Sequence, residues 1–283
     1  MMRTRFALLL LPLLLGGCAT IVDSASQRFA NALSAGILSQ TDEQVVRDGL
    51  PAYLLLVDGF IAEDPDNLRL LLAGADLYGS YAGAFVDDPE RAKRLAGRGR
   101  DYGERALCVA DDALCTAFGG PFDQWDAALA LVDADALEPL YGFAAAWATW
   151  IQVNSGDWDA IAELPKVEAA MARVVAIDDG FRDGWPHLYL GVLKTQLPPA
   201  YGGKPEEGRQ HFQQAIDQSQ GRNLMARVLF AERYARLVFD QELHDRLLNE
   251  TLASDVEADG LTLTNVLAHT RARELLEESN DYF

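Results

Sequence analysis

The side chains that could carry chemistry are three cysteines, four histidines and a large excess of carboxylates. His187, His211, His244 and His269 show no metal-ligand spacing with Cys108 or Cys115, so no zinc site is expected. Ser80 is no hydrolase nucleophile, because Tyr78 stands where a nucleophile elbow requires glycine.

Paired acids such as Glu206-Glu207 and Asp178-Asp179 do not indicate catalytic acids, because carboxylates are abundant throughout the chain. The sequence also contains no Gly-rich phosphate loop. The sequence therefore predicts no enzyme, no metal and no cofactor.

Cys18 follows Leu15-Gly16-Gly17, an arrangement that resembles a bacterial lipobox. Residues 1–17 contain Arg3 and Arg5 and an apolar run that is too short for a membrane span, as in an export signal. We expect cleavage before Cys18 and lipidation of its thiol. The alternative is an ordinary signal peptide with a chance cysteine. The absence of Asp after Cys18 resembles lipoproteins of the outer membrane.

Cys108 and Cys115 would lie roughly 10 Å apart on one continuous helix, too far for a disulfide. The intervening Asp111-Asp112 and the Gly119-Gly120-Pro121 run indicate that the helix ends between them. Export also places the chain in an oxidising compartment. We favour a disulfide over two free thiols.

The net charge of the whole chain is −19, and loss of residues 1–17 removes two arginines and no acid, leaving −21. Such a charge disfavours nucleic acid and anionic lipid as partners. It favours a soluble domain held to the membrane by its lipid alone.

The spacing of apolar residues predicts an all-α chain built from helical hairpins. The segment 184–219 predicts two antiparallel helices joined by a long turn, with Gly191 and Gly208 where the helices cross. Similar first-helix signatures place Ile151 forty residues before Gly191 and Ala231 forty residues after it. We expect tetratricopeptide-like repeats stacked as an α-solenoid. Residues 18–40 would form a tether and lead-in helix, and residues 41–283 one repeat domain.

Aromatic residues concentrate in the predicted helix 137–153, which contains Tyr141, Trp147 and Trp150. Such stripes usually belong to a core, and a lining for an apolar ligand is the alternative. The inserted turn 198–203 ends in Gly202-Gly203, and its Tyr201 could either anchor an interface or cover the gap between the helices.

Other helices are expected at 67–86, 122–132, 223–239 and 242–252, and one that opens at Leu164-Pro165 and ends at Asp178-Asp179-Gly180. Thr41 and Thr264 are the expected N-caps of the first repeat helix and the last helix, and 50–63 is expected as a separate helix. Six basic residues, Arg91, Lys93, Arg94, Arg98, Arg100 and Arg105, suggest either a docking stripe or, as we prefer, pairing with acids of the same helix.

Several short motifs, spread over nearly the whole mature chain, resemble the T-component (TatT) family of TRAP transporters. They include Gly49-Leu50-Pro51, Pro65-Asp66-Asn67, Tyr102-Gly103, Leu140-Tyr141-Gly142, Trp147-Ala148-x-Trp150-Ile151, Leu188-Tyr189-Leu190-Gly191, Tyr201-Gly202-Gly203-x-Pro205-Glu206 and Asp281-Tyr282-Phe283.

The resemblance implies a periplasmic lipoprotein that forms homotrimers and pairs with the solute-binding P-component of a tripartite ATP-independent periplasmic transporter. Such a protein would help to deliver an apolar or organic-anion solute. The candidate ligand- or partner-binding residues are Tyr141, Trp147, Trp150, Tyr189, Tyr201, Gly202 and Gly203. The alternative function is a general envelope-assembly scaffold that binds proteins and carries no solute.

Overall fold

The computed structural model describes residues 32 and 34–283, and every regular element in that part of the chain is a helix. The all-α prediction is thus confirmed. The export signal and Cys18 lie outside the described residues. The elements of the first half are α2 (Glu43–Glu63), α3 (Leu68–Phe85), α4 (Pro89–Ala110), α5 (Asp112–Phe118), α6 (Phe122–Leu129), η1 (Ala134–Ala136) and α7 (Leu137–Val153).

The second half continues with shorter elements and includes one π-helical segment, η4. Its elements are α8 (Trp158–Ile161), α9 (Leu164–Ile177), η2 (Phe181–Gly184), α10 (Trp185–Thr195), η3 (Pro199–Tyr201), α11 (Pro205–Gln218), α12 (Leu224–Leu229), η4 (Phe230–Ala235), α13 (Gln241–Ala253), α14 (Thr262–Glu277) and α15 (Ser279–Tyr282).

Short polar side chains begin the first helices. The side chains of Asp42, Asn67, Asp88 and Asp111 accept hydrogen bonds from backbone N–H groups of α2, α3, α4 and α5. Each cap satisfies donors that the first turn of a helix leaves unpaired. These caps explain why the chain breaks where it does, including between Cys108 and Cys115.

Three of the expected helix starts are wrong. Asp42, not Thr41, caps α2, and α2 runs unbroken through Pro51 instead of ending before residue 50. Five buried apolar residues along α2 hold it against α3 on both sides of the proline, which outweighs the lost N–H. The helix for which Thr264 was the expected cap, α14, begins at Thr262, and Thr264 lies inside its first turn.

The segment 184–219 forms the expected pair of antiparallel helices. A Cβ placed on Gly191 would lie 2.7 Å from the Phe212 ring, and one on Gly208 would lie 2.7 Å from Thr195. Contacts therefore run in opposite directions along α10 and α11, and only glycine allows so close a crossing. The positions spaced at forty residues, Ile151 and Ala231, are both buried, in α7 and η4.

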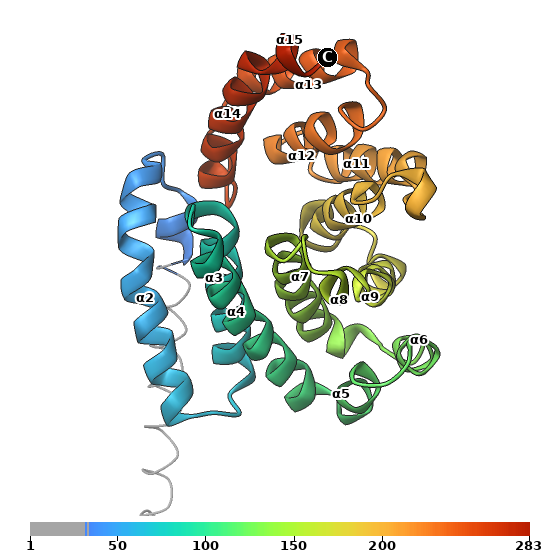
Figure 1. The fold of residues 1–283 in the computed structure, drawn as a ribbon. Coiled ribbons are helices and arrows are strands. Elements are labelled where there is room, and N and C mark those ends of the chain that lie inside the picture. The colour runs from blue at the N-terminus through green and yellow to red at the C-terminus, as the bar shows by residue number, and fades with distance from the viewer. Residues whose placement is uncertain (1–31, 33) are drawn as a thin grey trace, which may run out of the picture.

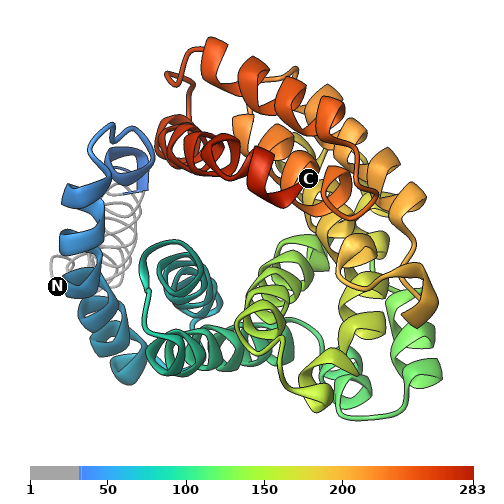
Figure 2. The ribbon, with the colours of Figure 1, turned by 45° about the horizontal axis from the view of Figure 1, so that its top comes forward.

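The helices follow one another around a ring. Successive elements pack side by side from α2 through α4, α7, α9 and α10 to α14, and α14 returns to contact α2 (Figures 1 and 2). Leu263 of α14 is buried in the apolar cluster formed by α2, α3 and α4. The chain therefore closes on itself through contacts between its N-terminal and C-terminal elements.

Candidate functional site

A pocket of about 180 Å³ opens where α7, α10 and η4 meet, beside the start of α9. Its wall is mostly apolar and includes Ile151, Leu164, Leu188, Val192, Leu193 and Leu229. Its polar groups are Thr149, Gln152, Tyr189, Gln196 and Arg233. An apolar wall with a few polar groups is typical of small-molecule sites, and a cavity of roughly 150 Å³ holds a molecule such as benzene.

Of the candidate residues named from the sequence, only Tyr189 lines this pocket. Trp185 also lines it, and the centroid of its ring lies 6.4 Å from that of Tyr189. Burial, and then the nearby Asp76 carboxylate, raise the pKa of Tyr189 to about 12. The phenol is therefore neutral at physiological pH and can both donate and accept a hydrogen bond.

Tyr141 lies behind Tyr189, with the two ring centroids 6.2 Å apart. It is buried against Phe181, and the Arg182 guanidinium carbon lies 4.9 Å from the centroid of its ring. Burial also raises the pKa of the Asp76 carboxyl, whose charge is partly compensated by Arg182. Tyr141 therefore supports the pocket from outside and does not line it.

Trp147 and Trp150 are not among the residues that line the pocket. Trp147 is fully buried, its ring stacks on Phe143, and its indole N–H donates to Glu163 at 2.5 Å. The Arg100 guanidinium carbon lies 4.1 Å from the centroid of the Trp150 ring. The ligand-lining hypothesis is wrong for Trp147, because its side chain is enclosed by packed aromatic rings.

The inserted turn projects from the hairpin. Tyr201 is 71% exposed, so it does not fill the gap between the helices. Gly202 has a φ of 92°, and a Cβ on Gly203 would collide with the backbone oxygen of Leu197. The two glycines thus shape the turn, and Tyr201 is a side chain that the turn exposes.

Cys108 and Cys115 form a disulfide across the break between α4 and α5, with their Cα atoms 4.6 Å apart. Asp111 makes this approach possible by ending one helix and capping the next. The bond lies in the scaffold and outside the pocket.

The arginines of α4 hold neighbouring helices together. Arg98 pairs with Asp58 of α2 at 3.0 Å, and Arg100 pairs with Glu163 at 2.9 Å. Only Lys93 makes the expected pairing within the helix, with Glu90. The preferred interpretation is therefore wrong for Arg98 and Arg100, because their side chains cross to other helices.

Arg233 is the charged residue among the pocket residues that the sequence did not lead us to expect. At the forty-residue spacing it corresponds to Leu193 and Val153, so a cation occupies a position that is apolar in the preceding copies. This change from an apolar to a charged residue was the feature of the sequence from which the site could have been predicted. The position is also in η4, and short π-helical segments occur often at functional sites.

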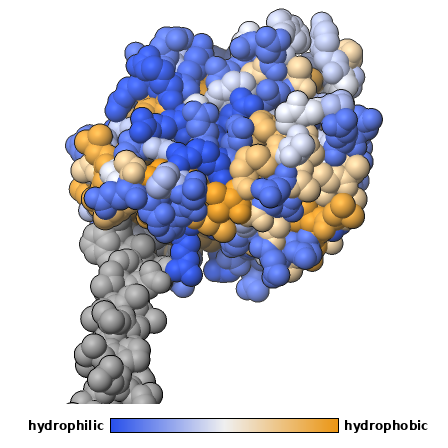
Figure 3. Space-filling model, turned by 90° about the horizontal axis from the view of Figure 1, so that it is seen from below, coloured by the Kyte–Doolittle hydropathy of each residue, from blue (hydrophilic) through white to orange (hydrophobic). Residues whose placement is uncertain are grey.

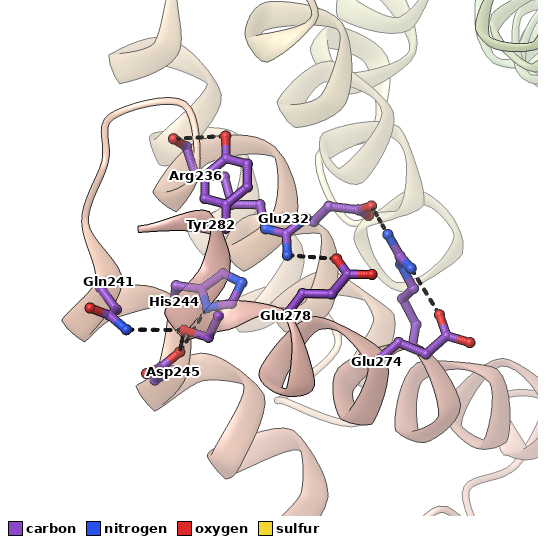
Figure 4. Close-up of polar contacts among 10 residues, drawn as sticks. Glu232, Arg236, Gln241, His244, Asp245, Glu274, Glu278 and Tyr282 are labelled. Carbon is purple, nitrogen blue, oxygen red and sulfur yellow. Dashed lines mark hydrogen bonds and ion pairs between the residues drawn. The ribbon is translucent and has the colours of Figure 1, made fainter.

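The charged residues close to Arg233 in the sequence, Glu232 and Arg236, pair with residues of other elements (Figure 4). Arg271 donates to Glu232 at 2.6 Å and to Glu274 at 2.8 Å. Arg236 pairs with Glu278 at 3.0 Å and lies over the Tyr282 ring. This network joins η4 to α14 and α15, and it fixes the segment that carries Arg233.

Within residues 34–283 no group of three or more His, Cys, Asp or Glu side chains is placed to hold a metal ion. No helix in the same range combines the length and apolar character that crossing a bilayer requires.

Comparison with known proteins identifies one family. A sequence model described as TRAP transporter T-component matches residues 39–283. A search of curated proteins found none that matches the chain.

Proposed function

Because the chain belongs to the TRAP transporter T-component family, we propose that it is the periplasmic lipoprotein that associates with the solute-binding P-component of such a transporter. In this role the protein would take an apolar or organic-anion solute into the pocket between α7, α10 and η4. The observation that carries the proposal is the family match over residues 39–283, with which a largely apolar pocket is consistent.

The anchor in this proposal is an acylated Cys18, with the body of the protein in the periplasm at the outer membrane. Leu15-Gly16-Gly17 before Cys18 supports this localisation. Mass spectrometry of the mature protein tests it directly. An unmodified thiol at Cys18, or cleavage at another bond, would contradict the lipid anchor.

We infer tetratricopeptide-like stacking of the hairpins and a homotrimeric assembly. The α10–α11 hairpin and the buried positions at forty-residue spacing support the stacking. Exposed apolar residues support an assembly: Leu55 and Phe60 of α2 are 74% and 45% exposed. Orange patches of hydrophobic residues also interrupt the hydrophilic surface on the face drawn in Figure 3.

The partner is tested by capture of the full lipoprotein from solubilised envelopes of the native cell. We expect the solute-binding protein of a TRAP system to be retained with it, through an interface above roughly 1,000 Å². An immobilised lipoprotein with Tyr201→Ala should retain less of that protein. If no solute-binding protein is retained while assembly factors of the envelope are, the scaffold function is the better account.

A further inference from the structure

Arg233 carries a charge that nothing in the described part of the chain neutralises. Its Nε atom is buried and has no hydrogen-bond partner, and the residue makes no ion pair among residues 34–283. The Nε donor has lost water and gained no acceptor, which costs stability, while the residue as a whole is only part-buried. Such a group in a pocket wall indicates an acceptor that is supplied by a ligand.

The neighbours of Arg233 do not supply that acceptor. The adjacent Glu232 carboxylate is taken by Arg271, and Arg236 on the next turn has Glu278 as its partner (Figure 4). No Asp or Glu is among the residues that line the pocket. Arg233 is therefore a single positive charge in a pocket with mostly aliphatic walls, in a protein whose overall charge is negative.

The chemistry of the pocket limits the ligand. A guanidinium binds a carboxylate through two parallel hydrogen bonds. A phosphate or a dicarboxylate would bring a second negative charge, and the pocket has no second cation to meet it. The aliphatic wall favours an apolar body, and a volume of about 180 Å³ restricts it to a short chain or a single ring.

We propose that Arg233 binds the carboxylate of a small apolar monocarboxylic acid, whose hydrocarbon part lies against Leu193, Val192 and Leu229. This inference rests on the solute-carrying part of the proposed function and names the class of solute. Gln152 and Gln196 offer further amide donors in the same pocket.

The test measures binding of octanoate and of 1-octanol to the full-length protein in detergent at pH 7.5. Calorimetry gives the affinities, and the fluorescence of Trp185, which lines the pocket, reports occupancy. The two probes share a chain length and differ in the carboxylate. We expect octanoate to bind at least 10-fold more tightly than octanol, as charge-assisted hydrogen bonds usually contribute.

Arg233→Met should weaken octanoate binding by 10-fold or more and leave octanol binding nearly unchanged. Arg233→Lys, which keeps the charge without the two parallel N–H groups, should give an intermediate affinity and serves as the readout if the Met variant does not fold. Arg246→Met is the matched control, because it removes the same charge from an exposed site on α13.

Equal affinities for octanoate and octanol, unchanged octanoate binding in Arg233→Met or Arg233→Lys, or no octanoate binding at millimolar concentration would each overturn the inference. Capture of the solute-binding protein does not depend on these results. Retained capture without octanoate binding would contradict the solute class alone, whereas octanoate binding without capture would contradict the proposed partnership.

Discussion

Tyr201 and Trp147 show how differently two aromatic candidates behave as single residues. Tyr201 stands 71% exposed on a turn shaped by two glycines, whereas Trp147 is fully enclosed and its N–H is satisfied by Glu163. An exposed aromatic contributes little to folding and is available to a partner. A buried aromatic residue stabilises the fold through its packing contacts, and its removal leaves a cavity.

Tyr201→Ala should change the free energy of unfolding by no more than about 0.5 kcal/mol. Trp147→Ala should lose about 3–5 kcal/mol, because it leaves a large cavity in the core. Urea denaturation of both variants measures the difference. A Tyr201 variant that unfolds as readily as the Trp147 variant would show that the turn is part of the core.

A second residue-scale feature is the histidine pair between α10 and α11. The Nδ1 atoms of His187 and His211 lie 2.9 Å apart, and the other ring nitrogen of His187 lies 3.0 Å from Asp179. Burial, His187 and Lys194 lower the pKa of His211 to about 4. His211 therefore stays neutral in the folded protein at a pH where the unfolded chain is already protonated.

Stability should consequently fall as the pH decreases from about 6.5 to about 4, since the unfolded chain binds the additional proton in that window. His211→Gln removes this contribution, so its unfolding free energy should depend less on pH across the same range. Urea denaturation at several pH values measures both slopes. Parallel slopes would mean that His211 titrates normally.

At the scale of elements, glycines set how closely helices approach. Gly191 meets the Phe212 ring across the α10–α11 crossing, and Gly99 meets the backbone of Gly79 across α3 and α4. Gly97, also inside α4, has room for a side chain, because a Cβ there would lie 4.0 Å from its nearest neighbour, the Trp150 ring. The same substitution should therefore have opposite effects at positions 97 and 191.

Gly97→Ala should stabilise the protein by up to about 1 kcal/mol, the usual gain in helix propensity. Gly191→Ala should destabilise it by about 1–3 kcal/mol, because the enclosed Phe212 ring has to move. Thermal or urea unfolding compares the pair. A stabilised Gly191→Ala variant would mean that the two helices can separate without cost.

At the scale of the whole molecule, α2 has apolar residues on its buried face and also apolar residues that are exposed. Val46, Leu50 and Leu54 face α3, while Leu55 and Phe60 are exposed. Solvent-exposed apolar residues grouped on one helix are typical of an interface. This surface is where we place the contact between copies of the chain.

If the proposed homotrimer forms through this surface, the double variant Leu55→Glu with Phe60→Glu should be monomeric at micromolar concentration where the wild-type protein sediments as a trimer. Its thermal unfolding should remain cooperative, because the buried face of α2 is unchanged. Leu131→Glu is the control, since Leu131 is 83% exposed but lies far along the chain, after α6. A trimer that survives the double substitution would place the interface elsewhere.

Local sequence determined the helical class, most helix limits, the α10–α11 hairpin and the helix break between the two cysteines. Apolar spacing, caps such as Asp111 and glycines act between residues a few positions apart, so the sequence displays them directly. Arg233 was not predicted as a site residue, but the sequence does show it as a charged residue at a position that is apolar in the other repeats.

The tertiary structure alone decided which aromatic residues are enclosed, where the pocket lies and how the ring closes. Leu263 reaches the cluster of α2 to α4, and Arg100 reaches Glu163, across long stretches of sequence. Such contacts depend on how all the helices stack and on small shifts at each crossing. Apolar periodicity reports that a residue is buried, but it carries no information on which distant helix covers it.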